Sequence, residues 1–200
     1  MPERGVGVCR RWSLLLMVIL LATTWLIGCG DVPWTRFESE DGGFSVEIPG
    51  TPAFSSQPLT TALGRLTVNK VELNVDEALD RSETYAVIWV DYPQEPVEPR
   101  AVTVFLDGVR DGNLRDAPGT LLREESVRVH GHDARDIIVE LKTGRGAYRN
   151  RFFMVKNRLY QLMVTRDRGD ATQQQADRFI ESFRLTGEDE RATVDDPTGS

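Results

Sequence analysis

His130 and His132 are the only histidines in this 200-residue chain, and a single glycine separates them. The two imidazoles could bind a metal ion, but a metal site needs further ligands from elsewhere in the fold. The same residues suit a β-hairpin turn, because Gly131 and Asp133 are typical turn residues. We favour the turn, and we predict no metal ion and no other cofactor.

The stretch DGGFSVEIPGTP, residues 41–52, raises a second candidate site. Paired glycines can form a phosphate-binding loop when a helix follows, because the helix N-terminus holds the anion. Here Phe44, Val46 and Ile48 alternate with polar residues, and prolines come next. This alternation predicts a hairpin turn followed by a strand, so we do not expect phosphate binding.

Other catalytic arrangements find little support in the residue pattern. The chain lacks the GxSxG motif of a serine nucleophile elbow. With two histidines in the chain, few residues are available for histidine-based acid–base catalysis. Carboxylates are abundant, but such groups lie mostly on protein surfaces. We therefore predict no catalytic residues and a protein that is not an enzyme.

The N-terminal segment, residues 1–28, has the composition of an export signal. Arg10 and Arg11 precede a largely apolar run over residues 14–27. This run is shorter than the roughly 20 apolar residues that cross a bilayer as a helix, and basic residues before a short apolar run are typical of a signal peptide. An uncleaved apolar anchor is the alternative, and the arginine pair leaves open whether export follows the twin-arginine route.

The apolar run ends in Leu26-Ile27-Gly28-Cys29, which resembles the lipobox of bacterial lipoproteins. In that motif the cysteine thiol is joined to diacylglycerol, whose acyl chains are fatty acids such as palmitate. The resemblance implies that Cys29 is lipidated and begins the mature chain, with residues 29–33 as a short tether. We expect an exported protein that is anchored by lipid to the bacterial cell membrane and faces the periplasm or the cell exterior.

The charge is unevenly distributed along the chain. The formal net charge of −7 argues against a nucleic-acid-binding protein. Residues 142–168 nevertheless contain eight basic residues and one acidic residue. A basic patch there could attract an acidic envelope partner or anionic lipid. Its members would be Arg149, Arg151, Lys156 and Arg158.

The alternative for this basic segment is pairing across strands with acidic neighbours. Antiparallel neighbours often carry complementary charges, and we favour this interpretation. The acidic neighbours would be Glu124, Glu125, Asp136 and Glu140.

Alternating apolar residues and β-rich composition predict a series of strands. Residues 49–58 contain several prolines, so we expect the chain to leave the sheet there. The expected strands are 34–39, 44–48, 66–75, 84–92, 121–129, 134–141, 148–155 and 159–165.

Two helices complete the predicted domain. One is expected over 101–114, although Gly108 and Gly112 weaken its pattern. The other carries an apolar stripe at Ala176, Phe179, Ile180 and Phe183. Short turns between consecutive strands predict an α+β fold over residues 34–186: a central, mostly antiparallel β-sheet flanked by helices. Residues 187–200 are acidic and poor in apolar groups, and we expect a disordered tail.

Three segments resemble PsbP-like domains: FESEDGGFSVEIPGTP, NRFFMVKNRLYQLMV and DRFIESFRL. That family includes photosystem II PsbP, the yeast Ran nucleotide-release factor and bacterial envelope proteins of the DcrB type. The resemblance implies an α/β/α sandwich and a role in binding or assembly of a protein partner. The alternative is a small-ligand receptor or an enzyme whose site is built from scattered carboxylates and arginines. The oligomeric state does not follow from the sequence.

The lipobox resemblance makes a direct prediction. Replacing Cys29 by serine removes the thiol that would carry the lipid, so the Cys29→Ser chain should accumulate as an unprocessed precursor. Metabolic labelling with palmitate and the mobility of the chain on a denaturing gel measure both effects. Normal processing of the serine variant would contradict lipidation at this position.

Overall fold

The structure is a computed structural model, and it describes residues 33–61, 64–77, 81–93, 99–142, 146–167 and 174–186. Residues from Trp34 onward belong to one compact unit. The predicted export segment, Cys29 and the acidic tail lie outside the described residues. Within the described residues, no helix is long and apolar enough to cross a membrane.

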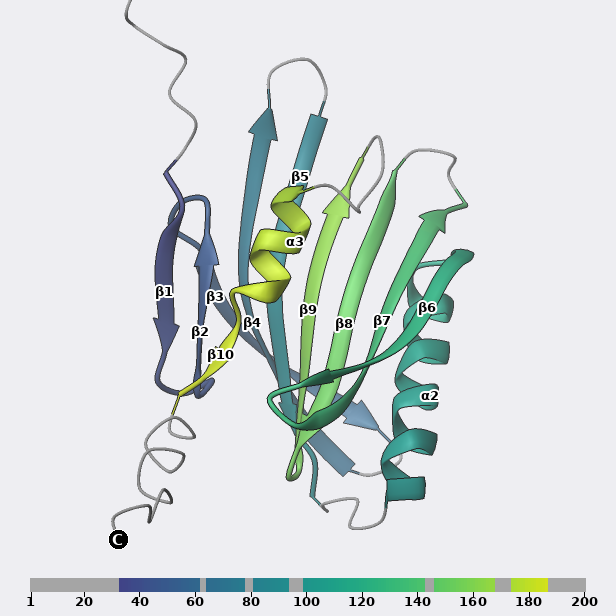
Figure 1. Cartoon of the computed structure of the whole chain (residues 1–200). Helices are drawn as coiled ribbons and strands as arrows, with labels where there is room; N and C mark the ends of the chain where they lie inside the picture. The colour runs from purple at the N-terminus through teal and green to yellow at the C-terminus, as the bar shows by residue number, and fades with distance from the viewer. Residues whose placement is uncertain are drawn as a thin grey trace, which may run out of the picture. The chain divides into compact units, whose positions relative to one another are not determined.

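A seven-stranded sheet forms the centre of the domain, with every neighbouring pair of strands antiparallel (Figure 1). The strands lie in the order β3-β4-β5-β9-β8-β7-β6. Their bounds are β3 Ala53–Thr61, β4 Gly64–Glu77, β5 Arg81–Asp91, β6 Gly119–Val129, β7 His132–Leu141, β8 Ala147–Val155 and β9 Arg158–Arg166.

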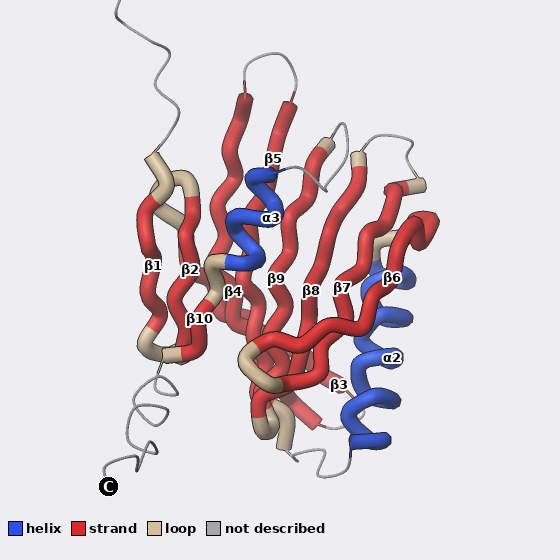
Figure 2. Tube along the Cα trace, viewed as in Figure 1, coloured by secondary structure: helices blue, strands red, loops and turns tan. Residues whose placement is uncertain are grey.

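A smaller antiparallel sheet and two helices pack beside the large sheet. The small sheet has the order β1-β2-β10. Figure 2 shows the described part of the chain with its strands in red and its helices in blue. The bounds of these elements are β1 Thr35–Ser39, β2 Phe44–Ile48, β10 Arg184–Leu185, α2 Pro99–Asp116 and α3 Gln174–Glu181.

The two helices cover opposite faces of the large sheet. Phe152 and Phe153 are neighbours in β8, yet Phe152 packs in a cluster with Leu106 of α2, whereas Phe153 packs in a cluster with Phe179 of α3. Successive side chains of a strand point to opposite faces, so we refer to an α2 face and an α3 face. The predicted fold class, an α+β domain with a mostly antiparallel sheet flanked by helices, is confirmed.

The α3 face carries the larger apolar core. Tyr85, Val87 and Trp89 of β5 are each 1% exposed and pack with side chains of α3 and of the small sheet. The apolar stripe of α3 is buried as predicted, with Ala176, Phe179 and Ile180 facing this core. The small sheet and α3 therefore cover this face together.

The first hairpin is confirmed, and its contacts exclude a phosphate loop. Gly43 turns the chain with φ 66°, a conformation that glycine adopts without steric cost. Arg158 donates hydrogen bonds to the carbonyls of Asp41 and Gly42 at 2.9 and 3.1 Å, and the Tyr160 hydroxyl donates to Gly42 at 2.7 Å. The turn presents carbonyl oxygens to a cation, whereas an anion site would need converging N–H groups.

One prediction about the strands was wrong. Residues 53–61 do not leave the sheet but form β3, with Pro58 opposite Thr67. Proline is tolerated because β3 is the edge strand of the large sheet, where the missing N–H group is not needed by a neighbouring strand. This extra strand widens the sheet beyond the reach of α2.

Candidate functional site

An open apolar groove lies between α2 and strands β3, β4, β5 and β9, and we call it the α2 groove. It has a volume of about 560 Å³. Its residues are Leu59, Val68, Ile88, Val90, Tyr92, Val104, Phe105, Gly108, Val109, Gly112, Asn113, Asp116, Ala117, Leu159, Gln161 and Met163.

The groove exists because α2 covers only part of its face. The buried side chains packed around Leu106 come from β7, β8 and Leu159 of β9, so α2 lies over the β7–β8 side of the sheet. On the other side, Leu59 of β3 is 47% exposed, and Val104 on the open flank of α2 is 63% exposed. Large apolar side chains are thus left in contact with solvent on both walls of one concave surface.

Three amide side chains form a hydrogen-bonded cluster at one part of the groove. Asn150 donates from Nδ2 to Gln161 at 2.9 Å and to Asn113 at 3.0 Å. Asn113 donates to Gln161 at 3.1 Å and to the carbonyl of Val109 at 2.8 Å. Asn150 is fully buried, and its Oδ1 has no hydrogen-bond partner within the described residues. The cluster therefore retains hydrogen-bonding capacity next to an apolar surface.

Gly108 and Gly112 line the groove from inside α2. A glycine within a helix costs roughly 0.5–1 kcal/mol relative to alanine. A Cβ atom added at Gly108 would meet no atom within 4 Å, and one at Gly112 would meet only the end of the flexible Arg115 side chain at 3.7 Å. Packing within the described domain therefore does not require either residue to be glycine.

The groove offers few groups for catalysis. Its titratable side chains are Asp116 and Tyr92, and burial raises the pKa of Tyr92 above its ordinary value. A nucleophile, a base and an oxyanion-binding group would have to converge for hydrolytic chemistry, and the groove residues do not supply that set. Its chemistry is that of apolar contact with a few neutral hydrogen bonds.

Two members of the predicted basic patch are buried, which corrects the expectation of an exposed patch. Arg149 and Arg151 of β8 are 5% and 9% exposed. Both donate to Asp136 of β7, with bonds of 2.8 and 2.7 Å to its Oδ2, and Arg149 donates at 2.9 Å to Oδ1. They lie on the α3 face, where they also pair with Asp177 and Glu181 of α3. The alternative, cross-strand charge pairing, is confirmed for Asp136.

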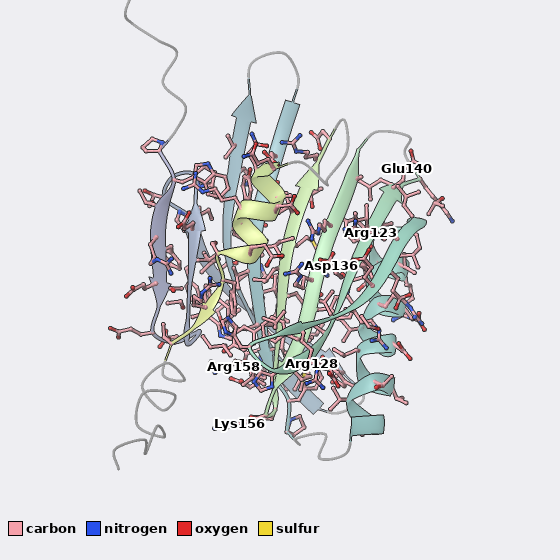
Figure 3. The ribbon with its side chains drawn as sticks, in the orientation of Figure 1. Arg123, Arg128, Asp136, Glu140, Lys156 and Arg158 are labelled. Carbon is pink, nitrogen blue, oxygen red and sulfur yellow. The ribbon has the colours of Figure 1, made fainter. Side chains whose placement is uncertain are left out.

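The remaining two members lie at the β8–β9 turn, at one end of the sheet (Figure 3). Lys156 is exposed and adopts φ 55° in this turn. The next residue, Asn157, exchanges hydrogen bonds with the backbone of Tyr92. Arg158 makes two hydrogen bonds to Asp91, 2.6 and 2.8 Å, and these bonds raise its pKa.

Two other predicted acidic neighbours pair elsewhere, and Glu140 lies opposite Ala147 of β8. Glu124 accepts hydrogen bonds from Arg110 of α2 and lies 3.4 Å from Arg135 of β7. Glu125 lies 3.6 Å from Arg123 within its own strand. The basic residues of 142–168 that are buried find their acids on β5, β7 and α3, as Arg166 does with Glu83 at 2.7 Å.

The hairpin turn predicted at the histidines is present, with His130 in the turn and His132 as the first residue of β7. His130 and Gly131 form the turn with φ 48° and 83°, and His132 pairs with Val129 across the strands. The His130 Nε2 atom lies 3.1 Å from the carbonyl oxygen of Phe183 and so ties this turn to the chain after α3. Among the residues that the structure describes, no three His, Cys, Asp or Glu side chains are placed to hold a metal ion.

Sequence reasoning missed the α2 groove, although two of its signals were present. One is that Ile88 and Val90 alternate with Val87 and Trp89 in the expected strand 84–92, so that apolar side chains fall on both faces. The other is the pair Gly108 and Gly112, which weakens the pattern of the expected helix. Neither signal shows that α2 leaves part of its face open, because that depends on where the helix packs across the sheet.

Comparisons with known proteins give similarity of fold alone. No family model and no curated protein matches the chain. A protein of unknown function, PA94 from Pseudomonas aeruginosa, is similar in structure at 11% identity, over 84% of this chain and 97% of that chain, with a TM-score of 0.38. The PsbP protein of the cyanobacterium Synechocystis is similar at 14% identity, over 79% of this chain and 95% of that chain, with a TM-score of 0.47. Neither similarity establishes an activity or a partner.

The buried carboxylate makes the first structural prediction. Asp136→Asn leaves two buried guanidinium groups without their shared counter-charge, so we expect the free energy of unfolding to fall by about 3–5 kcal/mol. Burial by itself raises the pKa of Asp136, but the hydrogen bonds and charges of Arg149 and Arg151 outweigh it and lower the pKa below its ordinary value. This contribution to stability is therefore present above about pH 4, the unfolded pKa, and is lost as the pH falls through the lower folded pKa.

Chemical denaturation of the full chain between pH 7 and pH 2 measures both effects. Asp133→Asn is the matched control, because Asp133 lies in the same strand but forms an exposed pair with Arg128, and such pairs contribute about 0–1 kcal/mol. If the two variants were equally stable, or if Asp136→Asn kept the full acid-dependent loss, the network would not have the role described.

Proposed function

We propose that this chain is an exported lipoprotein, held at a bacterial membrane by lipid on Cys29, whose domain binds a protein partner and does not catalyse a reaction. The anchoring part rests on the sequence: a basic and then apolar N-terminal segment that ends in a lipobox-like Leu26-Ile27-Gly28-Cys29. The binding part rests on one structural observation, the α2 groove.

The character of the groove supports binding over catalysis. It is concave and apolar and exposes Leu59 and Val104, and contiguous exposed apolar surface of this kind marks interaction sites. Only Asp116 among its residues carries a charge at neutral pH. The arginines and carboxylates that an enzyme of the alternative kind would use are paired with each other instead, as Arg149 and Asp136 are.

The proposed anchor would also restrict where the partner is found. Residues 29–33 separate the lipidated cysteine from the domain, and an extended chain reaches at most roughly 3.5 Å per residue. The domain would thus stay near the membrane surface, in the periplasm or at the cell exterior. A protein of the same membrane or of its immediate surroundings is the partner we expect.

A small-ligand receptor is the second candidate, and the size of the groove favours it. The volume of about 560 Å³ lies within the roughly 300–1,000 Å³ of small-molecule sites, which are mostly apolar with a few polar groups. The amide cluster of Asn113, Asn150 and Gln161 would provide those polar groups. The open walls of the groove fit a protein surface better, because small-molecule sites bury most of their ligand.

Partner binding through the groove is tested by placing a charge on its rim. Val104→Glu introduces a carboxylate that would have to lose its water on binding, at a cost in free energy, so we expect at least a tenfold loss of co-purified partner. The full-length chain is crosslinked gently in its native membrane, purified, and compared with the unchanged chain. Val104 is 63% exposed, so folding should be unaffected.

Leu122→Glu is the matched control, because Leu122 is 59% exposed on β6, away from the groove. This variant should recover the partner as well as the unchanged chain does. Failure to recover any protein with the unchanged chain would overturn the proposed function. Equal recovery with both variants would show that the groove is not the binding surface.

A further inference from the structure

We infer that the partner presents an α-helix to the α2 groove, packed beside α2 against the row Val104, Gly108 and Gly112. This inference rests on the proposed function, since it assumes a protein partner. It goes further by naming the element of the partner that binds, an α-helix, and the residues of this chain that contact it. Three independent features of the groove lead to a helix.

The first feature is the uneven cover of the large sheet. Strand β5 is apolar on both faces: Val87 and Trp89 point to the α3 face, and Ile88 and Val90 point to the α2 face. Apolar side chains on both faces of a strand favour a cover on each face, because removing apolar surface from water is favourable. The α3 face is closed by α3 and the small sheet, whereas beside α2 the same strands line an open groove. A second helix next to α2 would complete that layer.

The second feature is the row of small residues on α2. Val104, Gly108 and Gly112 follow one another at intervals of four residues, which is the row that forms the ridges and grooves of helix packing. Two glycines turn this row into a furrow where the side chains of another helix can lie close to the α2 backbone. Both glycines reduce the stability of α2, and no atom of the described domain needs the space at Gly108.

The third feature is the size of the groove. Its floor extends over β3, β4, β5 and β9, which is roughly 14 Å at about 4.8 Å between neighbouring strands. Its wall from Val104 to Gly112 is roughly 12 Å long at about 1.5 Å per residue. A helix with its side chains is roughly 10–12 Å across, so one helix would occupy the width of the floor over about two turns.

The amide cluster gives the groove a polar position. Asn113 and Gln161 line the groove, and the fully buried Asn150 behind them has an Oδ1 atom without a partner in the described residues. A single polar side chain on an otherwise apolar helix face would meet these amides. The helix expected here is therefore amphipathic, with apolar residues at intervals of three and four.

Site-specific photo-crosslinking in the native membrane tests the inference with the full-length chain. A benzoylphenylalanine residue replaces Leu59 on one wall or Val104 on the other. Both positions should yield a crosslink to the same protein, and mass spectrometry should place the crosslinked residues three, four or seven apart in one segment of that protein. A probe that replaces Leu122, exposed on β6 away from the groove, should not yield this product.

Substitution at Gly108 separates a filled groove from a damaged fold. Gly108→Trp fills open space and should reduce the Leu59 crosslink at least tenfold. Gly108→Ala should raise the Tm by about 2–4 °C, since a glycine-to-alanine gain in a helix shifts a domain of this size by that amount, while the crosslink changes less than with tryptophan. Leu122→Trp is the control for a surface tryptophan and should leave the crosslink unchanged.

Each other outcome overturns the inference in a recognisable way. Crosslinks only to lipid or another small molecule would show that the groove is a ligand site. Partner residues spaced two apart would show a bound strand. A partner that crosslinks from Leu122 but not from Leu59 or Val104 would leave the proposed function intact and place the interface elsewhere. A fourth outcome is that none of the three positions crosslinks to a protein and that gentle crosslinking of the unchanged chain recovers no protein. That outcome would overturn both the bound helix and the proposed function.

Discussion

The central constraint on this domain is that its middle strands are apolar on both faces. Removing apolar surface from water is the main favourable term in folding, so each face of the large sheet needs a cover. On one face the chain provides α3 and the small β1-β2-β10 sheet, and Tyr85, Val87 and Trp89 are almost completely buried there. On the other face the described residues provide α2 alone. The α2 groove is the part of that face which the described residues leave uncovered.

Among the described residues, the ion pairs with both side chains buried lie on the α3 face, whereas a more exposed network of Arg110, Glu124 and Arg135 lies between α2 and the sheet. Asp136 lies inside the α3 face with Arg149 and Arg151, and these arginines extend the network to Asp177 and Glu181 of α3. The network joins the short helix to the sheet, and each buried guanidinium has a counter-charge. Because these charges are used within the domain, the α2 groove is left with apolar walls and amides.

Some of this could be read from the residue pattern and some could not. The first hairpin, the strands from 66 onward, both helices and the antiparallel sheet follow from periodicity and turn residues, which act over a few neighbours. Strand β3 was missed because proline rules out a central strand but not an edge strand, and the pattern does not say which strand is at the edge. The charge segment was ambiguous for a similar reason: the distance between Arg149 and Asp136 depends on the pairing of β7 with β8.

The amino-acid sequence predicts which kinds of elements form this domain. It also predicts a lipid anchor at Cys29. Those conclusions depend on local order, such as the alternation of Phe44, Val46 and Ile48 or the residues before a cysteine. The pairing of the basic residues inside the domain and the open groove beside α2 became visible in the three-dimensional structure. Burial and the position of a helix across a sheet result from contacts between segments distant in the chain, here β3, α2 and β9, and no local pattern contains them.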